Sequence, residues 1–142
     1  MPSTEFDRPA LTARAVAASV SVASAAGIRV NDPQVLADAY SVRVHLKPAP
    51  IVARIATLTP VVRSPVESWL VRELSVAAFI AAKGAPVVPP SDFLPPVPHH
   101  CDGLTMSFWR YFEPISDALP GVAELEYECP RNGNIVKFQV MY

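Results

Sequence analysis

Residues 50–57, with the sequence PIVARIAT, place one charged side chain inside an apolar strand. The small and apolar residues on both sides of Arg54 predict a strand that is buried on both faces. A buried guanidinium without a partner costs several kcal/mol, which is a large share of the stability of a small domain. The fold of this chain must therefore either let Arg54 reach solvent or bring a carboxylate to it.

Residues 64–84 show the clearest helical pattern in the chain. Ser64 is the expected N-cap, Pro65 fits the first helical position, and Glu67 closes a capping box. Gly84 ends the pattern, and a proline follows soon after it. The sequence therefore predicts one long helix with defined ends.

Glu73 lies on the face of this helix that should be buried. The apolar members of that face are Trp69, Leu70, Ala77 and Ile80. An ion pair between Arg54 and Glu73 would satisfy both charges, and the planar guanidinium suits a carboxylate partner. The alternatives are that Arg54 reaches solvent or pairs with Asp38, and that Glu73 only borders the apolar face.

Further strands are expected on both sides of Arg54 in the chain. In residues 42–47 the apolar side chains alternate with charged or polar ones, which predicts a half-exposed strand. Val42, Val44 and Leu46 point one way, and Arg43, His45 and Lys47 point the other. The prolines of residues 47–50 turn the chain after this strand. Residues 33–40 are expected to add a strand before residue 42, and residues 104–113 to form another strand that Pro114 ends. These elements predict an α+β fold with a small antiparallel sheet packed on one main helix.

Both ends of the chain carry a further element. Residues 13–27 are rich in alanine and predict an amphipathic helix that ends at Gly27. Their small-residue texture also resembles a secretory signal, although the preceding residues are acidic as well as basic and the apolar core contains serines and no leucine. Residues 123–142 alternate around Asn132-Gly133, which predicts a C-terminal hairpin. The proline-rich residues 85–103 predict a stiff, extended segment that lies over the sheet.

The composition excludes several classes of protein. Of the 142 residues, 51% are hydrophobic and 18% are charged, as in a globular domain. A formal net charge of −1 gives no electrostatic signal for nucleic acid or for an anionic membrane. Cys101 and Cys129 are too few for a disulfide framework, so we expect free thiols and a cytoplasmic protein. A secreted binding domain is the alternative, and it requires both a signal peptide and a Cys101–Cys129 disulfide.

Three segments in this order resemble the N-terminal lobe of the kinase-like fold. They are VHLKPAPIVARIAT, RELSVAAFIAAKGAPVVPPSD and DGLTMSFWRYFE. Together they are similar to phosphotransferases of the aminoglycoside phosphotransferase and choline kinase group, over about residues 10–114. The resemblance implies a kinase-like lobe in residues 1–114 and a divergent tail in residues 115–142.

The resemblance also implies a nucleotide site. In kinase-like folds a lysine on the third strand contacts the ATP phosphates and is held by a helix glutamate. Arg54 and Glu73 occupy these two positions. Residues 37–41, which include Ser41, match the phosphate-covering loop, but they contain no glycine. Met106 is implied at the back of the adenine pocket, and Ser107 and Trp109 are implied to offer backbone groups to the adenine edge.

The catalytic part of that family lies in a C-terminal lobe that this sequence does not contain. None of the three histidines is followed by Gly-Asp, and no aspartate occurs after Asp117. We therefore expect a nucleotide-binding half without catalytic or metal-binding residues, in which magnesium binds only where a C-terminal lobe is supplied. The alternative is a non-catalytic interaction or regulatory module derived from that lobe. Its partner would be a second copy of the chain or a separate C-terminal lobe, because an uncovered apolar face favours association.

Residues 99–102, with the sequence HHCD, offer three types of metal ligand. Adjacent residues rarely aim at one ion, and no second pair lies at a ligand spacing. An exposed loop before a strand is the simpler interpretation. Cys101 lacks the neighbouring residues that would make it a nucleophile.

Overall fold

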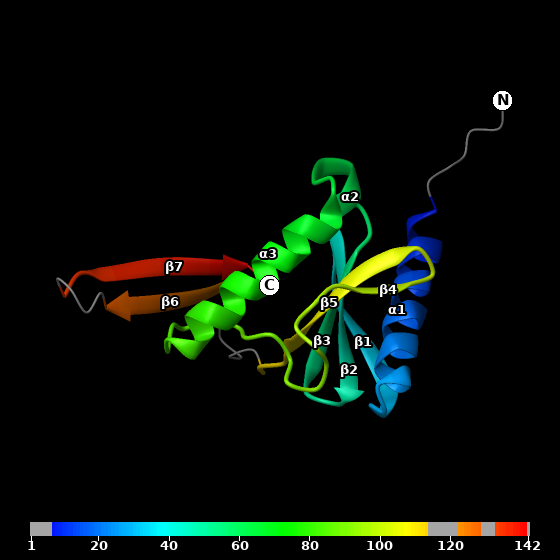
Figure 1. Ribbon diagram of the computed structural model, residues 1–142, viewed down its shortest axis with the longest axis horizontal. Coiled ribbons are helices and arrows are strands. Elements are labelled where there is room, and N and C mark those ends of the chain that lie inside the picture. The colour runs from blue at the N-terminus through cyan, green and yellow to red at the C-terminus, as the bar shows by residue number, and fades with distance from the viewer. Residues whose placement is uncertain (1–6, 114–121, 129–132, 142) are drawn as a thin grey trace.

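The computed structural model describes residues 7–113, 122–128 and 133–141 (Figure 1). Five antiparallel strands form the main sheet in the order β1-β2-β3-β5-β4, and β6 and β7 form a separate two-stranded sheet. The elements are α1 (Arg8–Ala25), β1 (Val30–Asp38), β2 (Ser41–Pro48), β3 (Ile51–Ala56), α2 (Thr59–Val62), α3 (Val66–Ala82), β4 (His99–Cys101), β5 (Leu104–Arg110), β6 (Val122–Glu128) and β7 (Ile135–Met141). The predicted α+β class and the antiparallel sheet are confirmed.

The main sheet separates the two long helices, with α1 along one side and α3 along the other (Figure 1). The side chains of β2, β3 and β5 alternate between these two faces. The α1 side is the hydrophobic core, and the predicted alternation of β2 is confirmed there. The half-exposed character predicted for β2 is not, because His45 on the other face is buried as well. The fully buried strand residues on the α1 side are Val42, Val44, Leu46, Ile51, Ala53, Ile55 and Met106.

The helix that closes the core is α1, whereas the prediction gave this role to residues 64–84. Helix α1 begins at an N-cap, where the Asp7 carboxylate accepts from the Ala10 amide at 3.0 Å. Its buried residues are all small: Ala15, Ala18, Ser19 and Ala23. These small side chains let the helix backbone approach the sheet closely. The larger apolar residues of α1 are only partly buried and pack against the core cluster: Leu11, Val16, Val20 and Val22.

Helix α3 differs from its prediction at the start and on its buried face. It begins at Val66 with Pro65 at the N-cap position, and no side chain caps it, so the expected Ser64 cap is wrong. Leu70 is buried as predicted, but Trp69 is 42% exposed. Guanidiniums of Arg63 and Arg72 lie over the Trp69 ring instead, at 5.0 and 5.7 Å from its centroid. The predicted end is confirmed, because Gly84 follows the helix with φ +81°.

Part of the proline-rich segment lies along the edge of the sheet, next to β5. The Ser91 amide donates to the Phe108 carbonyl at 3.0 Å, and the Arg110 amide donates to the Pro89 carbonyl at 3.1 Å. Leu94 is buried in the core cluster. The extended, helix-free conformation was correctly predicted, and the edge position follows because prolines tolerate only one paired side.

The C-terminal hairpin is present as β6 and β7, which pair from Val122–Met141 to Glu128–Ile135. Cys129 and Asn132 of the predicted hairpin lie outside the described residues, as do residues 114–121 around the expected domain boundary. Among the described residues, no helix combines the length and the apolar character needed to cross a membrane.

Candidate functional site

The face of the sheet toward α3 carries the charged residue that the sequence singled out. Across this face, Arg43 of β2, Arg54 of β3 and Ser107 of β5 lie directly opposite one another in the strand register. The core residues on either side of Arg54 in β3 point to the other face. Strand β3 is therefore not apolar on both faces, and Arg54 lies on the face that is not closed by α1.

Arg54 and Glu73 form the ion pair that the sequence predicted. The Arg54 Nη1 donates to the Glu73 Oε1 and joins β3 to α3. The two side chains keep 30% and 38% of their exposure, so water still reaches both charges. Asp38, the alternative partner, instead binds the Arg8 guanidinium at 3.1 Å.

Arg43 is the residue of this site that the sequence analysis missed as a functional candidate. It is half-buried, and no hydrogen bond or ion pair joins it to another residue in the described part of the chain. Burial lowers the pKa of Arg43, and the Arg54 guanidinium lowers it further, whereas the Glu73 carboxylate acts in the opposite direction. An arginine remains protonated under such conditions. The cluster of Arg43, Arg54 and Glu73 therefore holds two positive charges and one negative charge.

The signal for Arg43 was present in the sequence. A turn centred between Pro48 and Ala49 places residue 43 opposite residue 54, which is the register observed. The same turn places His45 opposite Val52. Reading the hairpin register together with the alternation would have brought both arginines to one face.

Ser107 and Trp109 extend the α3-side face along β5. Ser107 is fully buried, and its hydroxyl oxygen accepts from the Trp109 indole Nε1 at 2.9 Å. The backbone of these two residues lies opposite Arg54 and Val52 in the β3–β5 ladder. The side chains of both residues therefore share the face of Arg54, and Ser107 lies directly opposite Arg54.

Met106 lies on the opposite face of the sheet from Arg54. It is fully buried in the core cluster beneath α1, opposite Ile55 in the strand register. The register explains this, because neighbouring residues of one strand point to opposite faces. The structure therefore does not bring Met106 together with Arg54 and Glu73.

His45 lies on the α3-side face, one row beyond Arg43. Its ring stacks on the Tyr111 ring, with centroids 3.7 Å apart. The Nε2 atom lies 3.2 Å from the Ala49 carbonyl and must donate to it, so the neutral ring carries its lone pair on Nδ1, which is buried without a partner. Burial lowers the pKa of His45, the Lys47 charge adds to this, and the Ala49 hydrogen bond and the Glu113 carboxylate oppose it.

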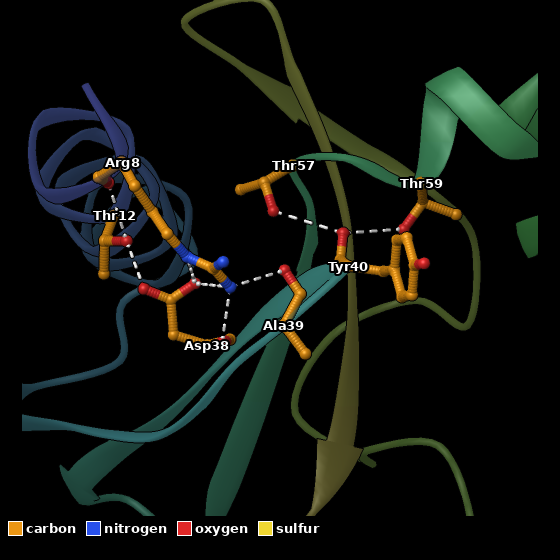
Figure 2. A network of polar contacts seen from close by, with 7 residues as sticks. All are labelled: Arg8, Thr12, Asp38, Ala39, Tyr40, Thr57 and Thr59. Atoms are coloured by element: carbon orange, nitrogen blue, oxygen red, sulfur yellow. Dashed lines mark hydrogen bonds and ion pairs between the residues drawn. The ribbon is translucent and has the colours of Figure 1, made fainter. Parts of the chain in front are cut away.

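Ser41 begins β2 directly after the turn at residues 39–40, which corresponds to the expected phosphate-covering loop. It is 7% exposed and shares the α3-side face with Arg43. Figure 2 shows that this turn is held from two sides. On one side, the Arg8 guanidinium donates to the Asp38 carboxylate and to the carbonyls of Asp38 and Ala39.

On the other side, the Tyr40 carbonyl holds the turn against the segment that enters α2 (Figure 2). This oxygen accepts from the Leu58 and Thr59 amides at 2.9 and 3.0 Å. The hydroxyls of Thr57 and Thr59 lie 3.2 and 3.1 Å from it. The contacts fix the turn without the glycines that phosphate-covering loops usually contain.

The HHCD segment is not the exposed loop that was expected, because His99–Cys101 form β4. His100 lies opposite Thr105 in the strand register, and its Nε2 atom is 3.4 Å from the Glu67 carboxylate of α3. His99 contacts the Pro95 carbonyl and the Phe108 ring, and the described residues contain no group of three or more histidine, cysteine, aspartate or glutamate side chains that could hold a metal ion. Cys101 is a free, half-buried cysteine. A groove of about 1010 Å³ runs between α1 and β1, on the core side of the sheet, and its lining does not include Arg43 or Arg54.

Comparison of this chain with protein-family models, with curated proteins and with solved structures found no match. The interpretation of the site therefore depends on its own geometry. That geometry is a sheet face with a strand-to-helix ion pair, a second arginine, a stacked His45–Tyr111 pair and Trp109.

Proposed function

We propose that this chain is the nucleotide-binding half of a small-molecule phosphotransferase of the aminoglycoside phosphotransferase type. The observation that carries the proposal is the Arg54–Glu73 ion pair between β3 and α3. In kinase-like folds the corresponding strand-to-helix pair positions a cation on the α and β phosphates of ATP. Arginine at this position keeps the positive charge and adds a planar fork that can bind phosphate oxygens in pairs.

Four residues at the α3-side face have a role in this proposal. Arg54 binds phosphate oxygens, and Glu73 fixes the direction of its guanidinium. Trp109, next to Val52 in the register, offers an aromatic surface for the nucleotide base. Ser41 lies near the fixed turn that would face the phosphates. Met106 has no role, because it lies in the core.

The proposal assigns binding but no phosphoryl transfer to these 142 residues. Transfer requires a base for the acceptor hydroxyl and carboxylates that hold magnesium. The sequence contains no His-Gly-Asp segment to supply them. We therefore expect the purified chain to bind ATP weakly and to show no ATPase activity, unless a C-terminal lobe with these groups is added.

Isothermal titration calorimetry with ATP tests the proposal directly. Arg54→Gln should weaken ATP binding at least about tenfold, the equivalent of about 1.4 kcal/mol, because a charged hydrogen bond to phosphate is lost. Arg29→Gln is the matched control, since Arg29 is exposed and lies before β1, and it removes the same charge. Equal loss in both variants, or ATP binding that Arg54→Gln leaves unchanged, would overturn the proposal.

A second candidate function, a non-catalytic interaction module, is favoured by the exposed surface of α3. Trp69, Val76 and Phe79 follow one another along that helix and are 42%, 52% and 64% exposed. Their spacing places them on one stripe, and an exposed apolar stripe favours association with another surface. Light scattering tests this function: a concentration-dependent oligomer that Phe79→Ser dissociates would support it, and a monomer at all concentrations would contradict it.

A further inference from the structure

The charge balance of the α3-side face is unusual for residues that have only a structural role. Arg43 and Arg54 lie directly opposite each other on neighbouring strands, where like charges destabilise a sheet. The Cβ atoms of such a pair are about 5 Å apart, so the two guanidiniums can reach the same ligand. Glu73 neutralises one of the two charges and is already bound to Arg54.

Arg43 is the guanidinium that has its hydrogen-bonding groups available. The described residues offer it no carboxylate within ion-pair distance and no hydrogen-bond acceptor. It is also half-buried, which strengthens its interaction with any anion that reaches it. If Arg43 had only a structural role, a neutral residue at this position would cost the fold little stability, because the repulsion between residue 43 and Arg54 would disappear.

We infer that Arg43 and Arg54 form a two-guanidinium clamp that binds a ligand with at least two linked phosphate groups. Arg54, held by Glu73, takes one phosphate, and Arg43 takes the next. A ligand with a single phosphate can occupy only one arm of the clamp and leaves the other charge uncompensated. The inference rests on the proposed function for the identity of the ligand as a nucleotide, but the clamp itself recognises only the linked phosphates.

The clamp predicts an order of affinities that follows the number of phosphates. Inorganic tripolyphosphate should bind most tightly, pyrophosphate less tightly and orthophosphate at least about tenfold more weakly than tripolyphosphate, because it loses one charged contact. The affinity should fall as salt is added, since both contacts are partly exposed to water. A single-arginine site would show a smaller difference between orthophosphate and tripolyphosphate.

Calorimetric titration of the full chain with tripolyphosphate and with ATP tests the clamp. Arg43→Gln should weaken tripolyphosphate binding about tenfold, Arg43→Lys should weaken it less because the charge is kept, and the exposed control Arg29→Gln should leave it unchanged. Circular dichroism confirms that each variant is folded. Tripolyphosphate binding that Arg43→Gln leaves at the wild-type affinity would overturn the clamp.

The two ligands separate this inference from the proposed function. If ATP binding depends on Arg54 but not on Arg43, the clamp is wrong and the nucleotide proposal stands. If tripolyphosphate binding depends on both arginines and ATP does not bind, the clamp stands and the nucleotide proposal is wrong. Binding of both ligands with dependence on both arginines supports the two together.

Discussion

Neutralising Glu73 tests the electrostatic organisation of the α3-side face through stability alone. Glu73→Gln keeps the size of the side chain and one acceptor oxygen, but it removes the carboxylate that lies between α3 and the two arginines. The variant leaves Arg43 and Arg54 opposite each other without a counter-charge. We expect a clear loss of stability, although Glu73 is not part of the hydrophobic core.

The magnitude follows from the partial burial of the pair. An exposed ion pair contributes about 0.2–1 kcal/mol, and breaking a buried one costs about 3–5 kcal/mol. Because the Arg54 and Glu73 side chains keep 30% and 38% of their exposure, we expect an intermediate value. The free energy of unfolding should fall by about 2 kcal/mol in Glu73→Gln.

A second substitution shows whether the loss arises from repulsion between the arginines. In the Glu73→Gln background, Arg43→Gln should restore about 1 kcal/mol, because it removes one of two uncompensated charges. In the wild-type background the same change should alter stability by less than about 0.5 kcal/mol, since lost attraction to Glu73 offsets lost repulsion from Arg54.

Urea unfolding followed by circular dichroism gives these free energies at neutral pH and low salt. Glu67→Gln is the matched control, because Glu67 lies in the first turn of the same helix and is 60% exposed. Its contact with the exposed His100 ring, at 3.4 Å, contributes little, so this variant should change stability by less than about 0.5 kcal/mol. A loss below about 0.5 kcal/mol in Glu73→Gln would refute the reasoning. So would an Arg43→Gln effect that is the same in both backgrounds.

Three further changes test other parts of the structure. Because the pKa of His45 is lowered in the folded protein, the unfolded chain binds more protons, and the free energy of unfolding should fall as the pH decreases below about 6.5. His45→Gln should flatten this pH dependence, as measured by urea unfolding at a series of pH values. Asp38→Asn should cost about 1–2 kcal/mol at neutral pH, because it weakens the contacts with Arg8 and Thr12. Its difference from the wild type should disappear as the pH falls below 3.8, since the Thr12 hydroxyl in particular lowers the pKa of Asp38. Ala15→Leu should cost about 1–3 kcal/mol in the same unfolding assay, because residue 15 is fully buried between α1 and the sheet and has no room for a larger side chain. An Ala15→Leu protein with wild-type stability would contradict the close approach of α1.

The Arg54–Glu73 pair could be predicted because each residue breaks a strong pattern. A charge inside an apolar strand and a carboxylate on an apolar helix face both need compensation, and each is the other's simplest partner. The alternation of β2 was predictable for a related reason, because one face of the strand is uniformly apolar. Patterns of this kind depend only on local geometry.

The assignment of the covering helix could not be predicted from the same patterns. Periodicity counts large apolar residues, and it therefore favoured α3 with Trp69 and Leu70 over α1 with its alanines. In the structure Ala15, Ala18 and Ala23 of α1 are buried and permit close packing, whereas Trp69 stays exposed beneath two guanidiniums. Which helix approaches a sheet depends on the packing of the whole domain.

The placement of Met106 shows where a family resemblance and the strand register differ. The resemblance implied an adenine-pocket position for Met106, near Arg54. The register places Met106 opposite Ile55, on the core face. Arg43, which the resemblance did not single out, is brought opposite Arg54 by the same kind of register. The core position of Met106 and the position of Arg43 opposite Arg54 both follow from the sequence, but only when the strands are paired residue by residue.

The central claim is that nucleotide phosphates bind between Arg43, Arg54 and the turn before β2. Titration of ATP into the isotope-labelled chain, followed by the guanidinium Nε–H and backbone amide signals in ¹H–¹⁵N spectra, tests it most directly. We expect the signals of Arg43, Arg54 and Ser107 to shift together with one affinity, while those of Ala15 and Ala18 on the core face stay in place. Shifts confined to the groove between α1 and β1, or no shifts at millimolar ATP, would contradict it.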